Sequence, residues 1–125
     1  MNNLLSWLYA GHMVGDYLFQ TRWMAERKTA SYPALIVHAV IYSFSVWLSS
    51  LPVSPAGKFG LSPWSVLFVF AAHAIIDRQN VTKWWCKNVT LSNRMWLLIM
   101  TDQALHIVIL ATTCLIDGHI SGGLF

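Results

Sequence analysis

Two segments of the sequence, residues 33–51 and 95–116, are apolar over a length typical of helices that cross a lipid bilayer. Such a helix needs roughly 17–25 mostly apolar residues. Two further apolar segments, residues 4–20 and 63–80, are shorter and carry charges, so we expect them in a bundle that turns its polar side inward. The sequence therefore predicts an all-α fold, an integral membrane four-helix bundle that forms a single transmembrane domain over residues 1–125.

The composition agrees with a membrane protein and argues against other classes. Hydrophobic residues make up 56% of the chain and charged residues 10%, whereas soluble domains carry about 25% charged residues. Disordered chains combine low hydrophobicity with high charge. The net charge of +3 is explained more simply by anionic lipids than by nucleic acid. We therefore expect the lipid bilayer as a partner, and no nucleic acid.

The basic residues predict how the bundle is oriented. Seven of the eight lie in or beside the connections that follow the first and third apolar segments, namely Arg22, Arg27, Lys28, Arg78, Lys83, Lys87 and Arg94. Only Lys58 lies in the second connection. Because basic loops stay on the cytoplasmic side of a membrane, both termini are predicted to lie outside (N-out/C-out).

Histidine and aspartate residues interrupt three of the four apolar segments. They form three pairs with a spacing of four residues: His12 with Asp16, His73 with Asp77, and Asp102 with His106. On an α-helix this spacing places both side chains on one face, one turn apart. All three pairs fall in the cytoplasmic half of the predicted bundle. Since each group alone in hydrocarbon would cost several kcal/mol, the sequence predicts that they share one polar cluster.

Imidazole and carboxylate groups are the usual ligands of zinc, iron and manganese, and helical bundles build metal sites from them. We expect zinc first, with manganese or iron as alternatives, and either two ions or one ion with an outer layer of hydrogen-bonded partners. The predicted metal ligands are His12, Asp16, His73, Asp77, Asp102 and His106, of which the three aspartates are also the catalytic candidates. A structural polar network without metal is the alternative.

Other polar residues near the pairs are expected to orient the ligands or contact a substrate. Gln20, Gln103 and His38 lie at the same depth as the pairs. Arg78 and Lys83 lie at the cytoplasmic mouth and can hold a phosphate. The alternatives are a satisfied core histidine for His38 and ordinary cytoplasmic charges for the two basic residues.

The strings GHMVGDYLFQTRWMAERK, LIVHAVIYS, FAAHAIIDRQN and TDQALHIVIL resemble a family of small bacterial and phage membrane proteins catalogued as domain of unknown function 3307. The family pattern has His-x3-Asp-x3-Gln, a His-rich second helix, His-x3-Asp and Asp-Gln-x2-His, in that order. Tyr42 replaces a second histidine of the second helix, and Asn80 replaces a basic residue. The resemblance implies a bacterial inner membrane and places Tyr42 beside the site.

The expected function is that of a membrane-embedded, metal-dependent hydrolase whose site faces the cytoplasm. The His-x3-Asp helices also resemble, more distantly, the all-helical zinc phospholipase C and P1-nuclease group. That likeness implies a phosphoester substrate, either a lipid or a lipid-linked headgroup.

Two other functions use the same residues. The first is ion or proton transport, which is less favoured because no polar trail leads to the outer side unless the chain forms an oligomer around a shared pore. The second is a non-catalytic membrane partner or modulator, in which the cluster only locks the bundle.

Overall fold

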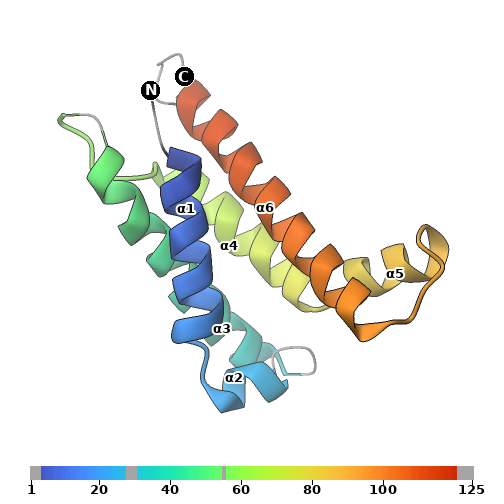
Figure 1. Cartoon of the computed structure of the whole chain (residues 1–125). Helices are drawn as coiled ribbons and strands as arrows, with labels where there is room; N and C mark the ends of the chain where they lie inside the picture. Colours follow the sequence, from blue (N-terminus) through green and yellow to red (C-terminus); the bar gives the residue numbers. More distant parts are fainter. Residues whose placement is uncertain (1–3, 28–30, 55, 121–125) are drawn as a thin grey trace.

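The computed structural model describes residues 4–27, 31–54 and 56–120. Helices joined by short connections make up this part of the chain (Figure 1). The elements in order are α1 (Leu4–Met13), the π-helical turn η1 (Val14–Leu18), α2 (Arg22–Arg27), α3 (Tyr32–Ser50), the 3-10 turn η2 (Leu51–Val53), α4 (Pro63–Asp77), α5 (Asn80–Asn88) and α6 (Met95–Ile120). No strand occurs within these residues, which confirms the predicted all-α class. Lys28 lies outside the described residues.

Four of the helices surround a common core. Helix α3 packs between α1 and α4, and α6 packs against both α4 and α1. Helix α2 packs against α3, whereas α5 packs against α4 and α6 and projects away from the other helices (Figure 1). Each of α1, α3, α4 and α6 therefore turns one face toward the same interior.

Two of these helical segments are long and apolar enough to cross a membrane. They cover Tyr32–Val53, which is α3 with η2, and Met95–Asp117 within α6. Helix α4 is apolar but shorter. The two segments coincide with the longest mainly apolar stretches of the sequence, and neither has a glycine or proline in its interior to end the helix.

The other two expected helices are broken in the structure. The expected helix over residues 4–20 is α-helical only to Met13 and then widens into η1, which ends at Leu18. The expected helix over residues 63–80 ends at Asp77 because Gln79 has a left-handed backbone with a φ of 68°. A residue in this conformation closes an α-helix, and the chain continues at once as α5.

Close contact between α1 and α3 depends on two glycines. A Cβ atom on Gly11 would lie 2.6 Å from Ser49 Oγ and 2.9 Å from the Ser45 carbonyl oxygen. A Cβ on Gly15 would lie 3.1 Å from the Cα of Tyr42. Small residues let two helix backbones approach closely, so these glycines set how near the first helix comes to the third.

The interior has an apolar end and a polar end. The apolar end is a cluster of buried side chains that includes Leu8, Val46, Leu61, Val69 and Leu110. The polar end contains His12, Asp16, His38, His73, Asp77 and His106, all buried. Because the polar residues of five different elements lie at the same level of the core, they can compensate one another there.

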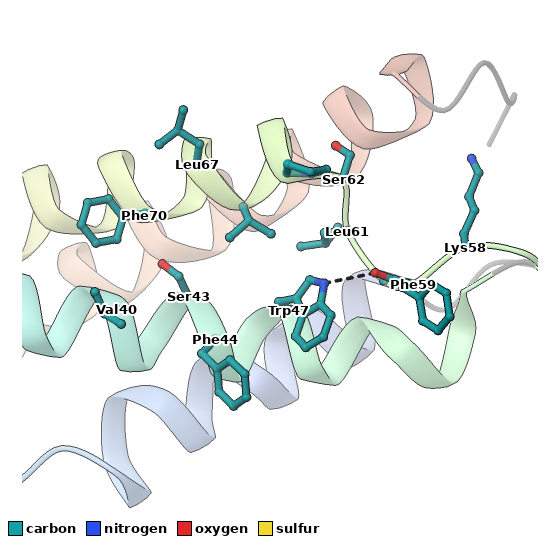
Figure 2. A pocket seen from close by; sticks show the side chains of 13 residues that line it. Val40, Ser43, Phe44, Trp47, Lys58, Phe59, Leu61, Ser62, Leu67 and Phe70 are labelled. Carbon is teal, nitrogen blue, oxygen red and sulfur yellow. Dashed lines mark hydrogen bonds between the residues drawn. The ribbon is translucent and has the colours of Figure 1, made fainter.

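A groove of about 1010 Å³ lies on the side of the core, between α3, α4 and the segment that joins them (Figure 2). Its walls are mainly apolar and include Phe44, Trp47 and Phe70. The Trp47 indole N–H donates to the Phe59 carbonyl oxygen at 3.1 Å and fixes one wall. None of the buried histidines and aspartates lines this groove.

Candidate metal centre

Four buried side chains from three elements meet at one position in the polar end. Asp16 comes from η1, His38 from α3, and His73 and Asp77 from α4. Each offers one ligand atom, and the four atoms lie within 4.8 Å of one another. We call these residues the four-residue cage.

The spacing of the cage atoms suits a metal ion. His38 Nε2 lies 3.0 Å from Asp16 Oδ1 and 2.8 Å from Asp77 Oδ2. His73 Nε2 lies 3.0 Å from Asp77 Oδ2 and 3.8 Å from Asp16 Oδ1. Tetrahedral ligands about 2.0–2.1 Å from a zinc ion are about 3.3–3.4 Å from one another. These four N–O distances lie on both sides of that value, and all four ligand atoms lie within 4.8 Å of one another, so the four residues could hold one ion.

The π-helical turn determines where Asp16 points. It lies at Val14–Leu18, after three turns of regular helix. A π-turn inserts an extra residue per turn and occurs frequently at functional sites. It directs Asp16 toward His38, while His12 Nδ1 stays 3.7 Å from Asp16 Oδ2. Gln20 supports the turn, since its amide N–H donates to the Asp16 carbonyl oxygen at 3.1 Å.

His106 lies beside the cage and fixes the orientation of His73. Its Nδ1 is 2.7 Å from the Asp102 carbonyl oxygen. A carbonyl oxygen can only accept, so this nitrogen carries the hydrogen. The other nitrogen, Nε2, is 3.0 Å from His73 Nδ1. With a neutral His106, the hydrogen of that second bond comes from His73 Nδ1.

With His106 neutral, this chain of hydrogen bonds leaves the lone pair of His73 on Nε2, which faces the cage. His73 Nε2 is buried and makes no hydrogen bond to any described residue, although it lies 3.0 Å from Asp77 Oδ2. Metal-binding histidines commonly hold their tautomer by donating the opposite N–H to a neighbour. The His73–His106 pair has the arrangement that such a ligand requires.

A second group of possible ligands shares Asp77 with the cage. It consists of Asp77, Asp102 and His106. Asp77 Oδ1 is 3.3 Å from His106 Nε2, so its two oxygens face different groups. The Asp102 side chain is 15% exposed. A cation between these three residues would need the lone pair of His106 Nε2, which the hydrogen bond from His73 Nδ1 occupies when His106 is neutral. The two roles of His106 are therefore alternatives.

Two glutamines hold the Asp102 carboxylate in place. The Gln79 amide donates to Asp102 Oδ1 at 2.9 Å, and the Gln103 amide donates to Oδ2 at 3.2 Å. Sequence reasoning did not single out Gln79. Its importance depends on the left-handed backbone that follows α4, and no pattern in the sequence marks that conformation.

His12 lies next to the cage and belongs to neither ligand group. Its Nε2 is 2.8 Å from Gln103 Oε1, which accepts, and its Nδ1 is 2.8 Å from the Tyr42 hydroxyl. Tyr42 also stacks on the His73 ring, with the centroids 3.6 Å apart and the planes at 8°. Tyr42 therefore orients two histidines, whereas both nitrogens of His12 are occupied by hydrogen bonds.

The two predicted phosphate-binding residues differ in position. Arg78 follows Asp77 directly, with its Cζ 4.6 Å from the centre of the Tyr32 ring and its Nη1 buried without a hydrogen bond to a described residue. Lys83 is exposed on α5 and lines a different hollow. Of the two basic residues, only Arg78 is next in sequence to a cage residue, so it is the better candidate for holding a phosphate at the cage.

A family model described as "Protein of unknown function (DUF3307)" matches residues 4–120. No curated protein and no solved structure matches the chain. The match covers every residue of the cage and its neighbours.

Proposed function

This chain belongs to the DUF3307 family, and we propose that it is a membrane-embedded, metal-dependent hydrolase of a phosphoester. The observation that carries the proposal is the cage, in which four buried ligand atoms lie within 4.8 Å of one another. The two membrane-length helices support a place in the bilayer. The basic residues, which lie mostly near the polar end of the core, favour the cytoplasmic side of a bacterial inner membrane.

Electrostatics favours a cation at the cage. Two buried carboxylates face the same nitrogen, because His38 Nε2 is within 3.0 Å of both Asp16 Oδ1 and Asp77 Oδ2. One N–H cannot donate a full hydrogen bond to two oxygens. Buried carboxylates are stable only when opposite charge or hydrogen bonds compensate them, and a divalent cation between these atoms would compensate both. Zinc fits the mixture of imidazole and carboxylate ligands, with manganese or iron as alternatives.

A bound divalent ion would supply Lewis acidity and a water molecule with a lowered pKa. Asp102 is the candidate base, because it is partly exposed and held by two amides. A water oxygen would bond to phosphorus while the ester P–O bond breaks. Asp102 would take the proton from the water and return it to the leaving oxygen. Arg78 would hold the negative phosphate oxygens.

Metal content and activity, measured on the same samples, test the proposal. The full chain in mild detergent should contain stoichiometric metal and hydrolyse bis-p-nitrophenyl phosphate. His73→Ala should lose both, while Asp117→Asn, a carboxylate change at the apolar end, should keep both. Wild-type protein without bound metal, or with full activity in a chelator, would contradict the proposal.

The same preparation separates the two alternatives. Transport predicts flux of protons or divalent metal in proteoliposomes. The apolar end of the core does not favour this, because its buried side chains offer no polar path for an ion; they include Leu8, Val46, Leu61, Val69 and Leu110. A purely structural role predicts metal-free protein with undiminished thermal stability.

A further inference from the structure

Helix α5 and the segment after it form a basic region with no acidic residue. From Asn80 to Thr101 the sequence contains three basic residues, Lys83, Lys87 and Arg94, and no aspartate or glutamate. Helix α5 projects from the core (Figure 1), so its charges are presented to the surroundings. The cage lies in the core, and this region is a separate surface.

Helix α5 has one buried face and one exposed aromatic face. Thr82 and Cys86 are buried, and the Cys86 thiol lies 3.5 Å from the Thr101 hydroxyl of α6. Trp84 and Trp85, in contrast, are 58% and 42% exposed. Lysine beside exposed tryptophan on a short amphipathic helix is typical of helices that lie at the surface of a membrane.

A hollow of about 650 Å³ lies between α5 and the start of α6. Its lining has a basic part, Lys83 and Lys87, a neutral polar part, Ser92 and Asn93, and an apolar part, Leu91 and Leu98. The two lysines are four residues apart, so they are neighbours on the helix and repel each other. Among the residues that the structure describes, neither pairs with a carboxylate.

We propose that this hollow binds the headgroup of an anionic phospholipid. The two ammonium groups would hold the phosphate, the Ser92 and Asn93 side chains would contact the polar headgroup, and the leucines would contact the start of the acyl chains. The apolar part of the lining and the neighbouring tryptophans favour a lipid over free phosphate. The proposal goes beyond the hydrolase and does not depend on a metal ion in the cage.

Native mass spectrometry of the full chain tests the proposal. The protein is released from micelles of a neutral detergent that contain equal amounts of phosphatidylglycerol and phosphatidylcholine. Wild type should retain phosphatidylglycerol preferentially. Lys83→Gln combined with Lys87→Gln should lower that preference by about tenfold or more, as expected for two lysines near an anionic surface.

The matched control removes two exposed positive charges elsewhere, Arg22→Gln combined with Lys58→Gln, and should leave the preference unchanged. Equal retention of phosphatidylglycerol by the lysine double variant and wild type would overturn the proposal. Displacement of the lipid by an equal concentration of inorganic phosphate would also overturn it, because the hollow would then bind free phosphate. Both lysines are exposed, so the double variant should fold, and its helical circular dichroism checks this.

Discussion

The two ends of the helical core hold aspartate in different ways. At the apolar end, Asp117 Oδ1 accepts hydrogen bonds from the Ser62 N–H at 2.9 Å and the Ser65 hydroxyl at 3.0 Å. At the polar end, Asp16 and Asp77 both contact His38 of α3, and Asp77 also contacts His73 of its own helix. Asp117 thus joins α6 to the start of α4 as an ordinary polar contact. Asp117 is only partly buried, whereas Asp16 and Asp77 are buried. The comparison teaches that one carboxylate with hydroxyl and N–H partners is not by itself evidence of a site, whereas buried carboxylates converging on shared imidazoles are.

The largest expected effect is that of Asp77→Asn. The change keeps the size of the side chain and removes the charge that both ligand groups share. Metal affinity should fall by more than about 100-fold, because a neutral amide is a poor substitute for a carboxylate ligand. Elemental analysis after dialysis measures this. Unchanged metal content in a folded Asp77→Asn protein would contradict the view that the aspartates of the polar end bind metal and Asp117 does not.

His106→Gln tests whether His106 orients His73 or binds an ion itself. If it orients His73, one equivalent of metal should remain, with the affinity lowered by about 10- to 100-fold. Titration with zinc and a competing chelator gives both numbers. A drop from two equivalents to one would show instead that Asp77, Asp102 and His106 hold a second ion.

Gly11→Ala should destabilise the packing of α1 against α3. The new methyl group would meet the Ser45 carbonyl oxygen at 2.9 Å, and backbone cannot move aside as a flexible side chain can. We expect a loss of about 1–3 kcal/mol in the free energy of unfolding, measured by denaturant unfolding in detergent. Gly57→Ala is the comparison, because nothing lies within 4 Å of its added methyl group and only its positive φ of 83° opposes the change. An equal or larger loss at Gly57 would contradict the importance of the α1–α3 contact.

Asp117→Asn should have the smallest effect and only on stability. An amide oxygen can still accept from the Ser62 N–H and the Ser65 hydroxyl, but more weakly than a carboxylate. The expected loss is about 1 kcal/mol in the free energy of unfolding, with metal content unchanged. Loss of metal in this variant would mean that the contact of Asp117 with α4 affects metal binding at the cage.

The length of the apolar segments and the spacing of the polar residues determined where the long helices lie and which polar residues share a helix face. The two longest mainly apolar stretches specified α3 and α6, because neither has a glycine or proline in its interior to end the helix. The four-residue spacing placed His73 and Asp77 on one face of α4, since neighbours at that distance along a helix share a face whatever surrounds them.

The tertiary structure decided which histidines and aspartates are in contact. His38 has no acidic partner four residues away, yet it contacts both Asp16 and Asp77. His12 has such a partner, yet its nitrogens bond Tyr42 and Gln103. The spacing within a helix fixes only the shared face, whereas contact between helices depends on their rotation and separation. Those depend on the π-turn at Asp16 and the close approach of α1 to α3, which form only when the helices pack.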